Sequence, residues 1–202
     1  MDPRQARTRS ALRDAIHTLA AAKRIDQVTV AEVSRVAGIT RDTFYRHAAT
    51  PVHLLADVLG EELDETLRAH ADLPARSDST LSVFDESERD LLRHVAEHAT
   101  IYRNSMHPRL IGPLRDALTE RIEQALAHHL DRHPHIAPPR EDGITPERHV
   151  RMLVAYAGAG TVAAIEEWLR SGDLDDIDAA ARTVIAASPA WWLGRSRPRA
   201  RA

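Results

Sequence analysis

The chain has 202 residues, 43% of them hydrophobic and 28% charged, a composition typical of a globular protein with an interior core. It contains no cysteine, which excludes disulfides and thiolate metal sites, fits a reducing compartment and leads us to expect a cytoplasmic protein. No apolar run reaches the roughly 20 residues of a membrane helix. The basic start MDPRQARTRS leads into no apolar segment, so we expect neither a membrane span nor a secretory signal.

Charge is distributed unevenly along the chain. Residues 1–50 carry nine Lys and Arg against five Asp and Glu, a net charge of +4, whereas residues 51–194 carry 14 against 25, a net charge of −11. The segment 195–202 adds four arginines and no acid. This asymmetry predicts that a polyanion would bind the N-terminal part. An ordinary Arg-rich first helix and a solvated C-terminal tail would explain the same charges. The charge distribution alone therefore does not decide whether the N-terminal part binds a polyanion.

The first expected helix carries its apolar residues at the spacing i, i+3, i+4, i+7, which is typical of an amphipathic helix with one buried face. These residues are Leu12, Ala15, Ile16, Leu19 and Ala22. Three arginines, including Arg7 and Arg9, precede this stripe on or before the first turn.

A capping box predicts the start of a short helix over about 29–37. The Thr29 hydroxyl can accept a hydrogen bond from the Glu32 amide while the Glu32 carboxylate reaches back to the amide of Thr29. Gly38 then supplies the left-handed residue that commonly ends a helix. This segment therefore contains its own start and stop signals.

A second short helix is expected directly afterwards, at about 40–47, with Thr40 as its cap and with Ile39 and Phe44 placed to pack as a hydrophobic staple. Two capped short helices joined by a tight turn with glycine make a helix-turn-helix, whose second helix enters the major groove of DNA. The sequence thus predicts a DNA-binding motif centred on Thr29–His47.

The second of these helices is rich in hydrogen-bond donors and positive charge. Arg41 is the best candidate to read a base edge, because a guanidinium can bond to guanine at two atoms, and Thr43 suits a base or a thymine methyl. Hydroxyl and imidazole groups suit phosphates. The predicted DNA-contacting residues are Thr29, Thr40, Arg41, Thr43, Tyr45, Arg46, His47, Arg7 and Arg9. The alternative is a surface helix pair with both Phe44 and Tyr45 in the core.

The rest of the chain is also predicted to be helical. A helix opens at Pro51, where proline is favourable at the first helical position, and runs to about Ala71. The polar stretch Ala75–Ser82 is the best linker candidate. Further helices are expected at about 85–105, 108–132, 146–170 and 175–188. No segment shows the alternation of a strand, so we predict an all-α protein.

The segment TVAEVSRVAGITRDTFYRHAATPVHLLADVL resembles the DNA-binding domain of TetR/AcrR-type transcriptional regulators. The likeness covers about residues 8–60 and rests on the first helix, the T-V-x-x-V-x-x-x-A-G-I-T pattern and the sequence T-F-Y-R-H. It implies a bacterial homodimer that binds a palindromic DNA operator, usually as a repressor released by a small hydrophobic ligand. It also implies that Tyr45 and His47 contact phosphate.

The resemblance further implies a TetR-like domain organisation of about nine helices. A three-helix, helix-turn-helix DNA-binding domain at 1–50 would be linked by the helix from about 51 to a C-terminal helical bundle at 51–194, which binds the ligand and dimerises. The segment 195–202 is expected to be a basic, disordered tail.

This chain departs from the family pattern after T-F-Y-R-H. Pro51 stands where the family commonly has a lysine that touches phosphate. We therefore expect one backbone contact fewer and a weaker, less salt-dependent affinity, which the N-terminal arginines can offset. Ala48 also leaves less apolar volume between the recognition helix and the helix that follows it.

The last two expected helices resemble the pair through which the family dimerises. Gly158 and Gly160 each cost up to about 1 kcal/mol relative to alanine inside a helix, which is easier to explain if small residues permit close helix approach or leave room for a ligand. The predicted interface residues are Gly158, Val162, Ile165, Leu169, Ile177, Val184 and Ile185. An intramolecular core is the alternative.

A ligand pocket is expected in the C-terminal bundle, lined by aromatic side chains and by methionines, which adapt to varied ligand shapes. The candidates are Tyr102, Met106, Leu110, Leu114, Met152, Tyr156 and Trp168. Ordinary core packing explains the same spacing.

Twelve histidines raise the possibility of a metal site. His94 and His98 are expected at i and i+4 on one helix, a pairing that can bind zinc, but no third ligand is evident, and the cluster at positions 128, 129, 133 and 135 has none either. We therefore predict no metal and no cofactor. Since no catalytic constellation is recognisable, we predict a non-enzyme. The competing hypotheses are a regulator of this fold that lacks an effector or activates transcription and, less favoured, a metal-dependent enzyme.

Overall fold

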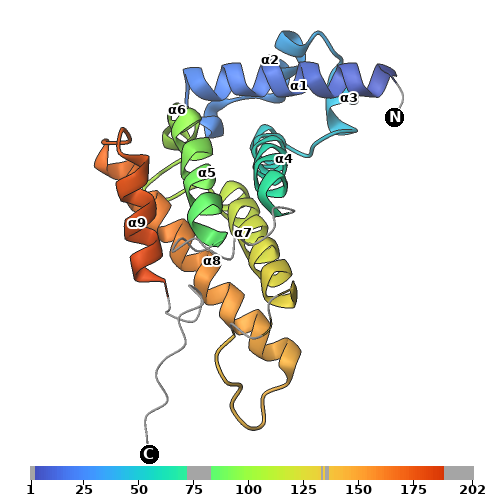
Figure 1. The fold of residues 1–202 in the computed structure, drawn as a ribbon. Coiled ribbons are helices and arrows are strands. Elements are labelled where there is room, and N and C mark those ends of the chain that lie inside the picture. Colours follow the sequence, from blue (N-terminus) through green and yellow to red (C-terminus); the bar gives the residue numbers. More distant parts are fainter. Residues whose placement is uncertain (1–2, 72–82, 133, 135–136, 189–202) are drawn as a thin grey trace, which may run out of the picture. The chain divides into compact units, whose positions relative to one another are not determined.

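The computed structural model describes residues 3–71, 83–132, 134 and 137–188. Within these ranges it contains nine α-helices, one short 3-10 helix and no strand (Figure 1). The α-helices are α1 Pro3–Ala22, α2 Val30–Ala37, α3 Arg41–Tyr45, α4 Pro51–Ala71, α5 Val83–Glu97, α6 Ala99–Asn104, α7 Gly112–Arg132, α8 Pro146–Ser171 and α9 Ile177–Ala187. The all-α prediction is confirmed. The expected linker Ala75–Ser82 and the tail at 195–202 lie outside the described residues.

The prediction of a single helix at 85–105 is wrong, because the chain forms two helices there. α5 ends at Glu97, and His98 leaves helical geometry, with φ −105° and ψ 20°. α6 begins at the next residue, and the Tyr102 amide donates to the His98 carbonyl over 3.0 Å. Ile101 and Tyr102, both on α6, are buried.

The first compact unit comprises Met1–Leu63 and Glu97–Leu118. α1 packs against α2 and α6, and its predicted apolar face is buried at Leu12 and Ile16. Asn104 at the end of α6 donates to the carbonyls of Ala20 and Ala21 at 2.8 and 3.1 Å, which satisfies two acceptors at the carboxyl end of α1. The predicted DNA-binding domain, 1–50, lies entirely within this unit.

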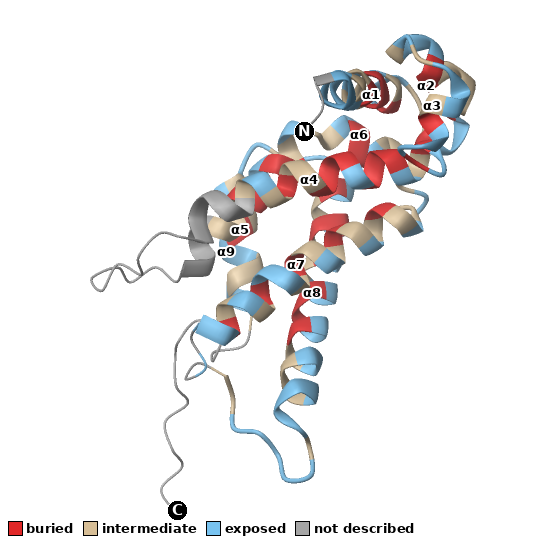
Figure 2. Ribbon diagram, turned by 90° about the vertical axis from the view of Figure 1, so that its right-hand side faces the viewer, coloured by how far each residue is buried: buried red, intermediate tan, exposed pale blue. Residues whose placement is uncertain are grey.

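The second compact unit comprises Asp64–Ala96 and Thr119–Ala202, so packing divides α4 between the two units. Its core includes Leu92, Val154 and Ile165, and Figure 2 shows buried residues recurring along α8. Gly158 explains one close approach in this unit, because a Cβ there would lie 2.9 Å from Glu123 Cγ of α7. At Gly160 a Cβ would have nothing within 4 Å.

Among the described helices, none is both long and apolar enough to span a membrane.

Four of the residues predicted for a dimer interface do not present surface to a second copy. Val162, Ile165 and Leu169 are 0%, 0% and 2% exposed in the single chain, and Gly158 is buried against α7, so all four are buried by their own chain. The intramolecular alternative therefore holds for them. Periodicity identified a buried face correctly but could not tell which chain buries it. Ile177, Val184 and Ile185 of α9 are half-buried.

Candidate nucleic-acid interface

The predicted capping box at the start of α2 is confirmed. The Glu32 amide donates to Thr29 Oγ1 at 3.3 Å, and the Thr29 amide donates to Glu32 Oε2 at 3.0 Å. Lys23 Nζ lies 2.7 Å from Glu32 Oε1. The hydrogen bond from Lys23, reinforced by those from Thr29, lowers the pKa of Glu32 to about 2, so this carboxylate stays ionised. The Thr29 hydroxyl, which we expected to contact DNA, is thus occupied in fixing the start of α2.

A tight turn joins α2 to α3, as predicted. Gly38 has φ +66° and ψ +32°, the left-handed conformation that residues with a Cβ adopt with difficulty, and the Ile39 amide donates to the Ser34 carbonyl at 2.9 Å. Thr40 then caps α3 by accepting from the Thr43 amide at 3.1 Å. The turn therefore fixes where the next helix begins.

The predicted recognition helix, α3, spans only Arg41–Tyr45, shorter than the expected 40–47. Arg46 is its C-cap, and the amides of His47 and Ala48 both donate to the Phe44 carbonyl, at 2.8 and 3.0 Å, and close the chain into a turn. This turn leads to Thr50, which caps α4 by accepting from the His53 amide.

One aromatic ring of α3 is buried and the next is exposed. Phe44 is 0% exposed, whereas Tyr45 is 60% exposed, and the two rings meet edge to face with centroids 5.7 Å apart. The alternative with both rings in the core is therefore wrong. Arg41, Arg46 and His47 are also exposed. Phe44 thus anchors a short helix whose predicted contact residues face solvent.

The side chains of α3 are also linked to one another, which the sequence did not predict. The hydroxyls of Thr40 and Thr43 lie 2.9 Å apart, and Arg46 Nη2 donates to Thr43 Oγ1 at 3.2 Å. A DNA contact by either threonine hydroxyl would have to share or replace these bonds. The exposed Arg46 side chain is thereby linked to Thr43 of α3.

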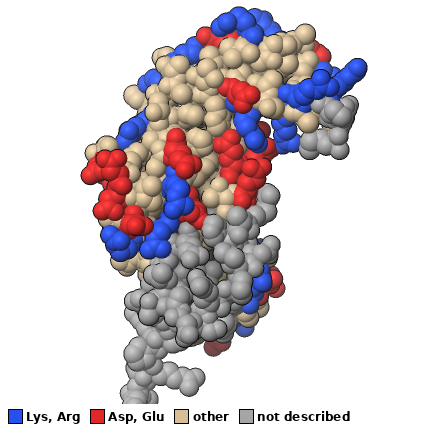
Figure 3. Space-filling view, turned by 45° about the horizontal axis from the view of Figure 1, so that its top comes forward, with Lys and Arg blue, Asp and Glu red and all other residues tan. Residues whose placement is uncertain are grey.

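The arginines of α1 are partly balanced within their own unit. Arg7 and Arg9 are exposed, but Arg9 pairs with Glu61, which also lies 3.4 Å from Arg13 Nη2. Figure 3 shows basic and acidic side chains intermixed on the face in view. Pro51 is buried at the first position of α4. The N-terminal arginines were expected to offset the phosphate contact that is lost at Pro51. Because Arg9 pairs with Glu61, it can contribute less to this compensation.

The residues predicted to line a pocket fall into two groups that belong to different compact units. In the first unit Tyr102, Leu110 and Leu114 are buried, and Met106 is half-buried. Burial raises the pKa of the Tyr102 hydroxyl well above its usual range, and the charge of Glu62 adds to the shift. In the second unit Trp168 is half-buried, while Met152 and Tyr156 are 56% and 74% exposed.

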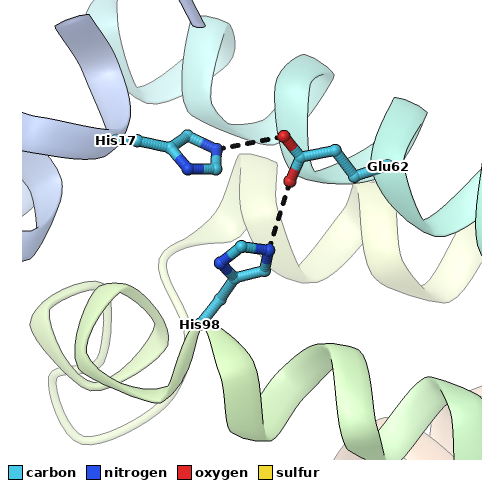
Figure 4. A group of neighbouring side chains, drawn as sticks. All are labelled: His17, Glu62 and His98. Atoms are coloured by element: carbon cyan, nitrogen blue, oxygen red, sulfur yellow. Dashed lines mark ion pairs between the residues drawn. The ribbon is translucent and has the colours of Figure 1, made fainter. Parts of the chain in front are cut away.

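The expected pairing of His94 with His98 is wrong, because the break between α5 and α6 separates them. His94 is buried on α5, whereas His98 meets His17 of α1 and Glu62 of α4 (Figure 4). Burial would raise the pKa of Glu62, but its ion pairs with His17 and His98 outweigh the effect of burial and hold this pKa well below its usual range. No sequence pattern indicates this cluster, since its members are more than 35 residues apart in the chain. Of the other histidine cluster, positions 133 and 135 lie outside the described residues.

No family model matches the sequence, and no curated protein matches it. Solved structures match it over most of its length. RolR in complex with resorcinol is 22% identical, with 98% of each chain covered and a TM-score of 0.60. The TetR family repressor AlkX from Dietzia sp. is 20% identical, with 91% of this chain and 94% of that chain covered and a TM-score of 0.56. The dihydroxyacetone kinase operon activator DhaS is 16% identical, with 89% and 95% covered and a TM-score of 0.57. These likenesses show that the chain has a TetR-like fold.

Proposed function

We propose, from the TetR-like fold and the exposed recognition helix, that this chain is a sequence-specific, DNA-binding transcriptional regulator. The observation that carries the proposal is the geometry of α3. Its buried Phe44 and capped start hold the helix against its own unit, while Arg41, Tyr45 and His47 remain exposed on it. A short helix with a fixed base and an exposed, donor-rich face is suited to entering the major groove.

Within this interface the exposed residues take different roles. Arg41 is proposed to bond to a guanine edge, because it is exposed at the first position of α3. Tyr45, His47, Arg46 and Arg7 are proposed to contact phosphates, which position a protein on DNA without reading its sequence. Arg9 is a weaker candidate, because Glu61 already pairs with it.

A homodimer is the second part of the proposal. One face of α8 carries exposed apolar residues at helical spacing, which suits a contact with the same helix of a second copy. These residues are Met152, Ala155, Tyr156, Ala159 and Ala163. The high exposure of Met152 and Tyr156 favours this role over the pocket lining expected from the sequence. A symmetric dimer would present two copies of α3 and so require two equivalent half-sites.

Release of the operator by a small hydrophobic ligand, with the chain acting as a repressor, completes the proposal. RolR is a precedent for a small ligand on this fold, since its structure contains resorcinol. DhaS, of similar fold, is an operon activator, so activation is the second candidate.

The test is selection of binding sites from random-sequence DNA at low salt with the full chain. We expect enrichment of a palindrome with two equivalent half-sites. Failure to enrich any consensus would remove the claim of sequence-specific binding, and enrichment of a single half-site would remove the dimer. Transcription from a reporter that carries the selected site then separates repression from activation.

Arg41→Ala is expected to relax specificity at one position in each half-site and to cost about 1–3 kcal/mol of binding free energy. The bidentate contact that is lost recognises one base pair, so base changes at the other positions of the DNA site should weaken binding of the variant as much as they weaken binding of the native chain. Binding to a panel of single-base variants measures this directly. Arg170→Ala, which removes an exposed arginine of α8 that pairs with Glu167, is the control. Equal weakening on every sequence would argue against a base contact.

Tyr45→Ala is expected to weaken binding to all sequences alike, roughly tenfold, because a phosphate contact of about 1.4 kcal/mol carries no sequence information. Fluorescence anisotropy on the selected site and on scrambled DNA measures both affinities. Tyr45→Phe keeps the ring and removes only the hydroxyl, so it should reproduce most of the loss. A changed consensus in either variant would contradict the phosphate role.

Tyr156→Arg is expected to convert the dimer to monomers, because it places a charge in the proposed apolar contact, where no partner charge is available. Sedimentation velocity measures the oligomeric state. Gln124→Arg introduces the same charge at an exposed position of α7 and should leave the dimer intact. A dimer that survives Tyr156→Arg would place the interface elsewhere.

A further inference from the structure

Three helical segments of the first compact unit bring together two imidazoles and a carboxylate (Figure 4). His17 Nε2 of α1 lies 3.3 Å from Glu62 Oε1 of α4, and His98 Nε2, at the junction of α5 and α6, lies 3.4 Å from Glu62 Oε2. One ligand atom from each residue lies within 4.8 Å of the other two. The side chains of His17, Glu62 and His98 are 24%, 18% and 24% exposed, so the cluster is shielded but reachable from solvent.

We propose that His17, Glu62 and His98 bind a divalent transition-metal ion of the zinc class. The ligands would be the two Nε2 atoms and one carboxylate oxygen of Glu62. Two imidazoles and a carboxylate are a donor set that zinc accepts, with bonds of about 2.0–2.1 Å. Tetrahedral angles at such bond lengths place neighbouring ligand atoms roughly 3.4 Å apart. His17 Nε2 and His98 Nε2 each lie at about this spacing from a carboxylate oxygen of Glu62, His17 from Oε1 and His98 from Oε2, so a turn of the carboxylate would be needed to bring one oxygen to both imidazoles.

An ion-pair cluster alone leaves one feature unexplained. His17 Nε2 is buried and, despite its 3.3 Å separation from Glu62, makes no hydrogen bond among the described residues. A buried polar nitrogen without a hydrogen bond is costly, and a metal ion that accepts its lone pair would remove that cost. Three protein ligands would also leave the fourth tetrahedral position to water or to a small anion.

One neighbouring cation opposes metal binding. Arg13 Nε lies 3.7 Å from Glu62 Oε1, although its Nη2 lies closer, at 3.4 Å, to Glu61 Oε2. Glu61 can therefore retain Arg13 while Glu62 turns to the metal. The guanidinium of Arg13 would still repel the metal ion, so removal of its charge is expected to strengthen metal binding.

A metal ion in this position would fix α1 in place. α6 already bonds to the carboxyl end of α1 through Asn104. The ion would add a second link, from His98 at the opposite end of α6 to His17 of α1, and tie both to α4. Since α1 is the first helix of the proposed DNA-binding domain, the ion would act on the geometry of that domain; this consequence rests on the proposed function, whereas metal binding does not.

The experiment uses the full chain stripped of metal, with Zn²⁺ in competition with a chromophoric chelator and Co²⁺ as a spectroscopic probe. We expect one ion per chain and an intense Co²⁺ ligand-field spectrum of tetrahedral type. His17→Gln and His98→Gln should each weaken zinc binding roughly 100-fold or more, because each removes one of three protein ligands. His128→Gln removes an exposed histidine of α7 and should leave the affinity unchanged.

Two further variants keep the test decisive if the histidine variants fold poorly. Glu62→Gln nearly preserves the shape of the side chain but removes the anionic ligand, so it should weaken zinc binding. Arg13→Gln should tighten it several-fold, because a nearby positive charge is removed. Absence of zinc binding by the native chain, or an unchanged affinity in the His17, His98 and Glu62 variants, would overturn the proposal. The assay contains no DNA, so its failure would leave the proposed DNA-binding function untouched.

Discussion

Phe44→Ala is expected to lower the free energy of unfolding of the first unit by about 3–5 kcal/mol and to abolish specific DNA binding. Phe44 is 0% exposed and is the one fully buried side chain of α3. A helix of five residues has too few internal hydrogen bonds to be stable by itself, so its position depends on this anchor. Loss of the ring would leave a cavity beneath the proposed contact face and release Arg41 and Tyr45 from their fixed positions.

Urea denaturation followed by circular dichroism measures the stability change, and binding to the selected operator measures the functional one. Tyr45→Ala is the matched control, since it removes a neighbouring ring that is 60% exposed and should cost well under half as much stability. A loss below about 1 kcal/mol for Phe44→Ala would mean that α3 is held by other contacts. Retained operator specificity would mean that the anchor does not control the contact face.

The helix-turn-helix could be predicted from the sequence because its signals are local. The capping box joins Thr29 to Glu32, three residues away, and Gly38 supplies the left-handed conformation at one position. Each signal constrains the backbone within a single turn of helix, so no long-range contact is needed to interpret it. The same locality explains why the cap of α3 at Thr40 was predicted correctly although the helix proved shorter.

The features that the sequence did not reveal depend on distant contacts. One helix was expected across 85–105, whereas the backbone leaves helical geometry at His98 and forms two helices. The same limitation applies to Val162 and Ile165, since a buried stripe looks alike whether it faces its own chain or a partner. The cluster at Glu62 is the extreme case, because three helices must pack before its members meet.

Glu88→Gln is expected to raise the free energy of unfolding at pH 8 by up to about 3 kcal/mol and to change it little near pH 4. Glu88 Oε1 is buried and has no hydrogen-bond partner among the described residues, and this burial raises the pKa of the carboxyl from 4.5 to about 7. Between these values the folded chain binds more protons than the unfolded one. The contribution of Glu88 to stability is therefore fully present below pH 4.5 and is lost as the pH rises through 7.

Glutamine occupies nearly the same volume and stays neutral at every pH, so the substitution should remove this pH-dependent loss and nothing else. Urea denaturation at pH 4.5 and at pH 8 compares the two regimes, and the gain should appear only at the higher pH. Glu97→Gln removes an exposed carboxylate from the same helix, α5, and should show no comparable gain. An equal gain at both pH values would trace the effect to packing, because ionisation of Glu88 is the only contribution that the pH change alters at this position.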